Sequence, residues 1–384
     1  MHPKITILGC GLAGMITALG FAKRNIPVTI IECRSSTDKN FFNDIRTTAL
    51  TSSSKSALQD IDIWGDLEKH TGCFNDIYVA DNKSNDMLHF SSEKIGSTER
   101  MGHLIENSNF KQELFALANS NELITILENT SYVIEKNTSQ ECKLLLNHKE
   151  QHNCDLLIVC DGRASIAKQQ YFSSQTEKAY NQHAITFIIR HEIAHEGTAV
   201  EHFLPSGPFA ILPLKNQHLS SIVWSVESDK LEAIMNLPRE ELTYLVQQNA
   251  GDFLGTIQIE NDAAAFPLKI YETKKYYNKK IVLVSDTAHI MHPLAGQGLN
   301  QGIKDIASLI NNIVKFKANQ YALERYQKER QADNSHMLEA TDLLNTIFSN
   351  RSRALRGIRQ FGFKAIENTP FLKSKLIKYA MGQR

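Results

Sequence analysis

The sequence predicts an α/β protein in which a Rossmann-like domain is interleaved with an antiparallel-sheet domain and followed by a helical C-terminus. Three observations support this prediction. The chain opens with a strand, a helix and a second strand. Residues 183–226 then hold four strand-like runs with no helix between them. From about residue 319 onward the spacing of apolar residues is helical.

The opening β-α-β unit is visible in the apolar pattern of the first 32 residues. KITILG at residues 4–9 predicts a buried strand, and LAGMITALGFAKRN at 12–25 predicts a helix with one apolar face. PVTIIE at residues 27–32 is rich in β-branched residues and predicts the second strand. ALTSSSKSALQDIDIW at residues 49–64 predicts a further helix.

The remaining elements alternate between the two architectures. Residues 123–160 predict short strands with polar turns, and the helix-free block at 183–226 favours an antiparallel sheet. A helix is predicted at residues 238–254, a buried strand at 279–286 and another helix from Gly296. The domains are therefore expected to be discontinuous. We assign residues 1–75, 104–168 and 266–325 to the Rossmann-like domain, 76–103 and 169–265 to the sheet domain, and 326–384 to the helical C-terminal region.

Composition indicates a globular protein with an uneven charge distribution. Of 384 residues, 42% are hydrophobic and 22% charged. Six cysteines without metal spacing, and a first strand with no secretory leader before it, predict a reducing, cytoplasmic compartment. No apolar run reaches the ~18 residues that span a bilayer.

Residues 351–384 carry nine basic residues and one acid, a net charge of +8. The rest of the chain carries a net charge of −8, so the whole chain is neutral. This basic tail predicts an acidic partner or a membrane surface rather than nucleic acid.

The first motif, GCGLAG, lies between the first strand and the first helix. Gly9 permits a tight turn, Gly11 lets a pyrophosphate approach the backbone, and Gly14 lets helix and strand pack closely. Glu32 ends the second strand, where a carboxylate can accept hydrogen bonds from ribose hydroxyls. Strand, helix and acid in this order predict a dinucleotide site, although the motif does not separate FAD from NAD.

Two further motifs follow later strands. Asp161 and Gly162 come after the run DLLIVC; alone, an Asp-Gly pair predicts only a turn. Asp286 closes a buried strand, and PLAGQG at residues 293–298 then leads into a helix. The start of a helix carries free N–H groups and partial positive charge, which suits a ligand that becomes negatively charged.

With these three motifs in order, the chain resembles the single-component, FAD-dependent aromatic hydroxylases with the p-hydroxybenzoate hydroxylase fold. RTTALTSSSKSALQDIDIW, GPFAILPL, SIVWSV, HPLAGQGLNQGIKD and YAMG narrow the resemblance to the branch that hydroxylates ubiquinone precursors. The resemblance implies FAD as cofactor and NADH or NADPH as co-substrate. It implies that the FAD site comprises Gly9, Gly11, Leu12, Ala13, Gly14, Glu32, Cys33, Arg34, Arg46, Asp161, Gly162, Asp286, Pro293, Gly296, Gln297, Gly298, Leu299 and Asn300.

The resemblance also implies the reaction: ring hydroxylation of a polyprenylated phenol in ubiquinone synthesis, with O2, through a C4a-hydroperoxyflavin. It implies as well that Phe209, Ile211 and Pro213 face the substrate ring. Alternation places these three on one side of a strand, and their other interpretation is the core of the sheet. His289 either holds its loop by hydrogen bonds or moves protons near the ring. Lys168 departs from the Arg usual in the Asp-Gly motif, and Lys cannot reproduce a bidentate contact.

Alternative functions remain at this point. One is hydroxylation of a small soluble phenol, and another is a non-catalytic flavoprotein scaffold in a quinone-synthesis complex. HEIAH at residues 191–195 matches a zinc-protease pattern, but a strand runs directly into it and no metal is expected. The tail mixes Arg351, Arg353 and Arg356 with apolar residues, which fits either a peripheral membrane contact or a packed helix.

Overall fold

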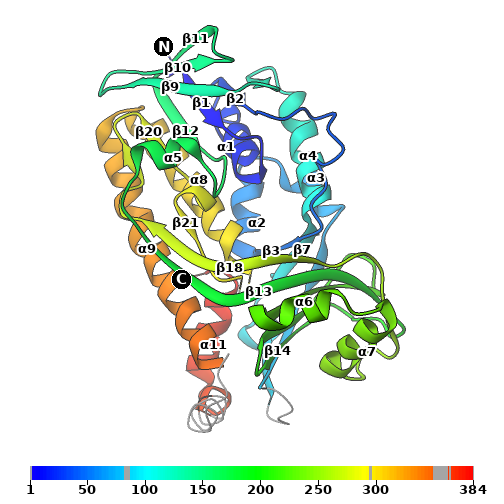
Figure 1. Cartoon of the computed structure of the whole chain (residues 1–384). Helices are drawn as coiled ribbons and strands as arrows, with labels where there is room; N and C mark the ends of the chain where they lie inside the picture. The colour runs from blue at the N-terminus through cyan, green and yellow to red at the C-terminus, as the bar shows by residue number, and fades with distance from the viewer. Residues whose placement is uncertain (1, 82–86, 294–295, 349–361, 363–364, 384) are drawn as a thin grey trace.

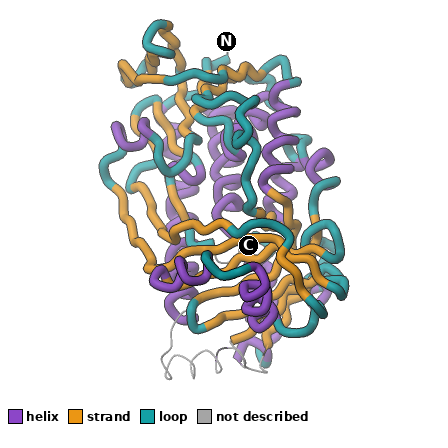
Figure 2. Tube along the Cα trace, turned by 45° about the vertical axis from the view of Figure 1, so that its right-hand side comes forward, coloured by secondary structure: helices purple, strands orange, loops and turns teal. Residues whose placement is uncertain are grey.

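The computed structural model describes residues 2–81, 87–293, 296–348, 362 and 365–383. A six-stranded sheet with its helices fills one end of the molecule, and a larger sheet crosses the other end (Figure 1). Figure 2 shows the same two strand-rich regions from a second side, with helices packed between and around them. No helix in the described part of the chain is both long and apolar enough to cross a membrane.

The six-stranded sheet is the Rossmann-like part. In spatial order its strands are β19 (Tyr277–Asn278), β20 (Ile281–Leu283), β12 (Leu156–Val159), β1 (Ile5–Leu8), β2 (Val28–Ile31) and β8 (Ile124–Leu127). All neighbouring pairs are parallel except β19 with β20. β1 and β12 are buried along their whole length, which explains their continuous apolar runs.

The helices around this sheet pack through apolar faces. In the first half of the chain these are α1 (Leu12–Ala22), α2 (Ser52–Gln59), α3 (Trp64–Glu68), α4 (Asn107–Asn119) and α5 (Ile166–Tyr171). The later ones are α8 (Gln297–Phe316) and α9 (Gln320–Phe348), whereas α11 (Pro370–Ala380) packs against the larger sheet. The helix expected at residues 49–64 is shorter than predicted: residues 49–51 lie in a strand, α2 spans only Ser52–Gln59, and a turn in which Asp62 has φ of +59° separates it from α3.

The second sheet has nine strands. In spatial order they are β21 (His289–Ile290), β18 (Ala264–Thr273), β13 (Gln175–His191), β16 (Leu219–Glu227), β15 (Gly207–Pro213), β14 (Thr198–Leu204), β5 (Asp76–Asp81) and β6 (Met87–Ser91), with β17 (Ile257–Ile259) also paired to β13. The sheet is antiparallel as predicted, except that β14 and β5 run parallel. β18 pairs with β13 along most of its length, so residues 266–273 belong to this sheet and not to the Rossmann-like segment expected from residue 266.

One face of the nine-stranded sheet is covered by α6 (Ser228–Met235) and α7 (Arg239–Ala250), which form a second hydrophobic core with it. Two small sheets complete the fold. They comprise β9 (Tyr132–Asn137), β10 (Cys142–Leu146) and β11 (Glu150–Cys154), and β3 (Thr47–Thr51), β7 (Gly102–Glu106) and β4 (Gly72–Phe74). The turn η1 (Glu93–Ile95) follows β6, and η2 (Ser285–Thr287) follows β20.

Candidate active site

Four parallel strands bring the predicted motifs to one edge of the six-stranded sheet. Leu8 at the end of β1 is level with Ile31 of β2 and Val159 of β12, and Val159 is level with Leu283 of β20. The loops after these strands carry the glycine motif, Glu32, the Asp-Gly pair and Asp286. Ligands of open parallel sheets bind at this carboxyl edge, so segments far apart in sequence form one site.

The three glycines of the first loop serve different purposes. Gly9 has φ of +94°, and a Cβ there would lie 2.8 Å from the Cα of Asp161 in the neighbouring loop. A Cβ on Gly14 would lie 2.0 Å from the carbonyl oxygen of Gly9. Gly11 has no atom within 4 Å of its Cβ position, and as N-cap of α1 it offers no side-chain hydrogen bond. The start of α1 is therefore open to an anionic group such as a pyrophosphate.

Glu32 is held as a carboxylate. Its side chain is buried and accepts hydrogen bonds from the backbone N–H of Cys10 at 2.9 Å and of Arg34 at 3.0 Å. Burial alone would raise the pKa of Glu32, but these two N–H donors and the Arg34 charge lower it below its ordinary value. The thiol of the exposed Cys33 lies 3.5 Å from the Glu32 carboxylate.

Asp161 has a buried oxygen that fits a hydroxyl donor. The Tyr132 hydroxyl donates to its Oδ2 at 2.8 Å, whereas its Oδ1 is buried and has no hydrogen-bond partner in the described structure. Burial raises the pKa of this carboxyl. Gly162 follows with φ of +80°, which turns the chain away from the strand. An unsatisfied buried oxygen costs free energy, and a hydroxyl of a bound dinucleotide would remove that cost.

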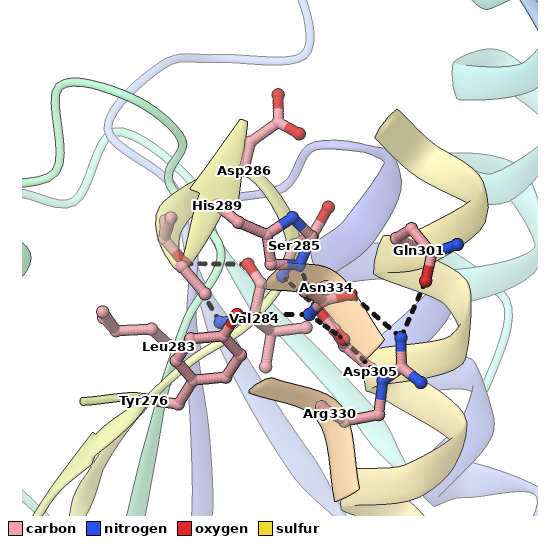
Figure 3. A network of polar contacts seen from close by, with 12 residues as sticks. Tyr276, Leu283, Val284, Ser285, Asp286, His289, Gln301, Asp305, Arg330 and Asn334 are labelled. Carbon is pink, nitrogen blue, oxygen red and sulfur yellow. Dashed lines mark hydrogen bonds and ion pairs between the residues drawn. The ribbon is translucent and has the colours of Figure 1, made fainter. Parts of the chain in front are cut away.

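Asp286 points away from a buried network that holds its loop (Figure 3). Ser285, with φ of +59°, donates its N–H to Asp305 Oδ2 at 3.2 Å, and His289 Nε2 lies 2.6 Å from the same oxygen. Arg330 of α9 donates to Asp305 Oδ1 at 2.8 Å. His289 is thus placed to hold its loop through Asp305 of α8, which Arg330 of α9 also contacts.

Asp305 anchors this network as a charged group. Full burial alone would raise the pKa of Asp305, but His289 and Arg330 together hold it down at about 2. Asn334 donates to Oδ1 at 3.0 Å, so the carboxylate is bonded on both oxygens. A buried ion satisfied in this way fixes the backbone that presents Asp286.

The start of α8 resembles that of α1. Gly296 has φ of +61° and provides no side-chain cap, and the Cβ position of Gly298 is open. Asn300 is used internally instead, because its Oδ1 accepts from the N–H of Thr51 at 3.0 Å and its Nδ2 donates to the carbonyl of Ala49 at 2.7 Å. Leu299 packs against the hydrophobic core. Asn300 and Leu299 therefore hold the start of α8 in place. The polar side-chain atoms of Asn300 are used for contacts within the protein.

Arg46 lies between the two sheets. It forms a bidentate ion pair with Asp44, at 2.8 and 2.6 Å, and its guanidinium lies 5.3 Å from the ring centroid of Phe266. The Asp44 carboxylate raises the pKa of Arg46, and the charge of Asp286 contributes in the same direction. Arg46 thus contacts Phe266 of the large sheet and is also close enough to Asp286 to be stabilised by its negative charge.

Lys168 connects two of the site's loops. Its Nζ donates to the carbonyl of Arg163 at 3.2 Å and lies 4.2 Å from the ring centroid of Tyr271. The Tyr271 hydroxyl in turn donates to the carbonyl of Asp286. Burial lowers the pKa of Lys168. The two tyrosines, Tyr132 and Tyr271, were not singled out in the sequence because no motif distinguishes them.

A large cavity adjoins this site. Its volume is about 660 Å³, and Arg46, Pro293, Gly296 and Gln297 lie in its wall. Most of the remaining wall comes from the nine-stranded sheet, β3, α9 and α11, and is largely apolar. The predicted FAD-site residues therefore border a space large enough for a second ligand.

The substrate-pocket assignment of Phe209, Ile211 and Pro213 does not match this cavity. The cavity is lined instead by their neighbours on β15, Pro208, Ala210 and Leu212. Phe209 and Ile211 point to the other face of the sheet, into the core under α7. The strand was identified correctly, but alternation alone does not say which of two apolar faces is the core.

The HEIAH segment is not on a helix. His191 ends β13, and its ring nitrogens lie 2.7 Å from the Ile193 carbonyl and 3.0 Å from the Ser220 hydroxyl. His195 Nε2 lies 3.0 Å from the Leu214 carbonyl. The two imidazoles are thus bonded within turns of the sheet, and the part of the chain that is described contains no group of three or more potential metal ligands.

Known proteins match this sequence over almost the whole chain. The chain is 29% identical over 385 residues to the ubiquinone hydroxylase UbiL of Rhodospirillum rubrum, covering 98% of this chain and 89% of that protein. It is 28% identical over 389 residues to the 3-demethoxyubiquinol 3-hydroxylase of Escherichia coli, covering 99% and 98%.

A solved structure and a protein family complete the comparison. The p-nitrophenol 4-monooxygenase PnpA of Pseudomonas putida superposes with a TM-score of 0.80 at 14% identity, covering 100% of this chain and 99% of that one, which establishes the fold. The family described as FAD binding domain matches residues 3–341. The open helix starts and the unsatisfied Asp161 oxygen fit that cofactor. This chain belongs to the FAD-binding domain family, and FAD is its cofactor.

Proposed function

We propose that this chain is an FAD-dependent monooxygenase that hydroxylates the aromatic ring of a polyprenylated phenol in ubiquinone synthesis, using O2 and NADH or NADPH. The observation that carries the proposal is the large apolar cavity bordered by Arg46, Pro293, Gly296 and Gln297. A polyprenyl chain needs an apolar space of this kind, and its ring must reach the flavin. The names of the relatives from Rhodospirillum rubrum and Escherichia coli point to the same substrate class.

In this proposal FAD, when bound, supplies the oxygen-activation chemistry. The protein binds and orients the cofactor and the substrate and encloses the reacting groups. Gly9, Gly11 and Gly14 admit the pyrophosphate, and Glu32 and Asp161 accept hydrogen bonds from hydroxyls. The start of α8 at Gly296 stabilises negative charge on the ring system. The apolar walls exclude water from the reacting groups.

The test uses the purified yellow holoenzyme in air. NADH or NADPH oxidation is measured with 2-geranylphenol and, separately, with 4-hydroxybenzoate, and the products are examined for one added oxygen from 18O2. We expect stimulation and labelled product with the prenylated phenol alone. Stimulation by 4-hydroxybenzoate alone would favour a hydroxylase of small soluble phenols, and no stimulation by either would favour the non-catalytic scaffold.

The cellular test is deletion of the gene in its own host. Mass spectrometry of the quinone pool should show loss of ubiquinone and one accumulated precursor, whose structure names the ring position. An unchanged pool would contradict a non-redundant role in this synthesis.

We also propose a peripheral contact of the C-terminal region with an anionic membrane or a quinone-synthesis complex. Residues 351, 353, 356 and 359 of the basic tail lie outside the described residues. Within α11, Phe371 is 80% exposed, and Lys375 and Lys378 are exposed near it. Such a combination supports binding at an interface. Co-sedimentation with anionic vesicles, lost at high salt, is expected; equal recovery with zwitterionic vesicles would contradict the electrostatic part.

A further inference from the structure

Strand β14 contributes one acidic side chain to the wall of the apolar cavity. Its cavity-facing positions are Ala199, Glu201 and Phe203. Across the sheet, Glu201 is level with Val79 of β5 and Ala210 of β15. A cross-strand row that is otherwise apolar at this end of the cavity therefore contains a carboxyl group.

The carboxyl of Glu201 has no partner within the described structure. No hydrogen bond or ion pair reaches it, and its neighbour His202 points to the opposite face, where its Nδ1 lies 2.8 Å from the Asn249 carbonyl. Glu201 keeps part of its surface accessible, and the cavity is the space that this surface faces. An isolated carboxyl facing an apolar cavity is costly unless a ligand uses it.

Among the described residues, no charged group offsets the burial of this acid. Burial is the only cause that these residues contribute to the pKa of Glu201, and it raises that pKa to about 8. On the strands next to β14, the cavity-facing groups adjacent to Glu201 are apolar; Asp81 of β5 lies level with Phe203 and is itself buried. Where α9 approaches, Phe348 stacks on Phe203 at 3.9 Å. The titratable groups elsewhere in the cavity wall are Arg46, Arg163, Lys269, His292 and Tyr379.

A second unsatisfied polar atom lies in the same row. The hydroxyl of Thr186 on β13 is buried without a partner in the described residues. Ala210 and Val223 lie between Glu201 and Thr186, so three strand spacings separate them, or roughly 14 Å. That separation is too great for both to contact one ring oxygen, and only Glu201 can accept a proton.

We propose that Glu201 binds the hydroxyl of the substrate phenol and takes its proton. In this step the phenol O–H bond breaks, its electron pair stays on the phenol oxygen, and an O–H bond forms on the Glu201 carboxylate. The phenolate ring is more electron-rich than the phenol ring and is therefore a stronger nucleophile. This inference rests on the proposed function and assigns its proton acceptor.

The physical reason for a buried acid here is its basicity. An ordinary glutamate, with a pKa near 4.3, is a weak base toward a phenol with a pKa near 10. Burial in an apolar wall brings the pKa of the glutamate closer to that of the phenol, so proton transfer between them costs less free energy. Above about pH 8 the side chain is a carboxylate and can accept the proton, and below that pH it is already protonated.

The test compares the wild-type holoenzyme with Glu201→Gln, using 2-geranylphenol as the probe. The kcat/KM for substrate-stimulated NAD(P)H oxidation should rise with pH and level off above about 8 in the wild type. In Glu201→Gln we expect it to fall by about 100-fold or more at high pH and to lose this rise. Glu201→Asp, which retains a carboxylate, should keep the pH-dependent rise at a lower rate.

A binding measurement provides a readout that does not require turnover. A hydrogen bond from the phenol favours the carboxylate form of Glu201, so binding near pH 7.5 should release a proton from the wild type. Calorimetry in buffers of different ionisation enthalpy counts that proton, and Glu201→Gln should release none. The matched control is Glu260→Gln, which removes a surface carboxylate paired with Arg190 at 2.8 Å and should behave as the wild type.

The outcomes separate this inference from the proposed function. If the wild type responds to prenylated phenols and Glu201→Gln keeps the same pH profile and the same proton release, the role of Glu201 is overturned. If the wild type responds to no phenol in turnover, the proposed function fails. The proton count on binding then still decides whether Glu201 contacts a phenol.

Discussion

Single residues at the edge of the six-stranded sheet have separable roles in folding and in cofactor binding. Gly14 lies where a Cβ would overlap the backbone of Gly9, so it is needed for packing. Gly11 lies where a Cβ would meet only open space, so we propose that it is needed for FAD binding and not for packing. The glycine motif therefore contains one residue required for packing and one that we expect to be required for cofactor binding.

This difference predicts opposite behaviour of two substitutions. Gly11→Val should leave the apoprotein folded but abolish FAD retention, because a branched side chain would occupy the approach of the pyrophosphate. Gly14→Ala should lower the free energy of unfolding by about 1–3 kcal/mol or more through overpacking. Flavin absorbance and thermal unfolding of the apoproteins measure the two effects. A yellow Gly11→Val protein would refute the assignment.

Asp305 makes a residue-scale prediction about acid stability. Because its pKa of about 2 lies below the ordinary value near 3.9, its stabilising charge is fully present above pH 4 and is lost as the pH falls through 2. The shift corresponds to roughly 2–3 kcal/mol. Asp305→Asn should therefore be less stable than the wild type at pH 6, with a gap that narrows below pH 4. A gap that stayed constant from pH 6 to pH 2.5 would contradict this account.

At the scale of elements, strand β15 separates two apolar environments. One face completes the core under α7, and the other forms the wall of the cavity. Both faces are apolar, so the strand reads as a continuous hydrophobic run, and its sequence does not show which face binds a ligand. Only the position of α7 decides this.

Adjacent residues of β15 should consequently respond differently. Ile211→Ala should lower the free energy of unfolding by about 2–5 kcal/mol because it leaves a void in the core. Ala210→Phe should fold but raise the KM for a prenylated phenol, because the ring would fill the cavity. Denaturant unfolding and steady-state kinetics test the pair. Loss of stability in Ala210→Phe together with an unchanged KM would mean that the faces are reversed.

At the scale of the whole molecule, the cavity is closed by segments that are distant in sequence. Leu376, Tyr379 and Ala380 of α11 lie in its wall beside residues of the nine-stranded sheet. Met381 is fully buried, and its carbonyl accepts the N–H of Ser53 at 3.2 Å. Near the end of the chain, α11 thus lines the cavity while Met381 contacts the start of α2.

Removing α11 should uncouple NAD(P)H oxidation from hydroxylation of the substrate. A chain ending at residue 369 should retain FAD but form less hydroxylated product per NAD(P)H consumed, by several-fold, because water enters the cavity. Hydrogen peroxide assays alongside product analysis measure the ratio. Phe371→Ser, on the exposed face of the same helix, is the control and should leave the ratio unchanged. An unaltered ratio in the shortened chain would show that α11 does not seal the cavity.

The sequence by itself determined the elements and the FAD motifs. Glycine spacing, Glu32, Asp161 and Asp286 are local features that directly follow predicted strands, and the order of those strands implies that their ends meet. The sequence also contained a signal for Glu201, since it interrupts the apolar alternation Ala199, Glu201, Phe203. That signal is weak, because the same acid on an exposed face would look identical.

Only the tertiary structure decided which side of β15 is the cavity, that Asn300 is used in packing, and that His289 bonds to Asp305. These properties depend on partners more than a dozen residues away, and often more than two hundred. Local propensity and periodicity carry no information about such partners. Burial and hydrogen bonding are set by which surfaces meet, and that is settled when the two sheets and the C-terminal helices pack together.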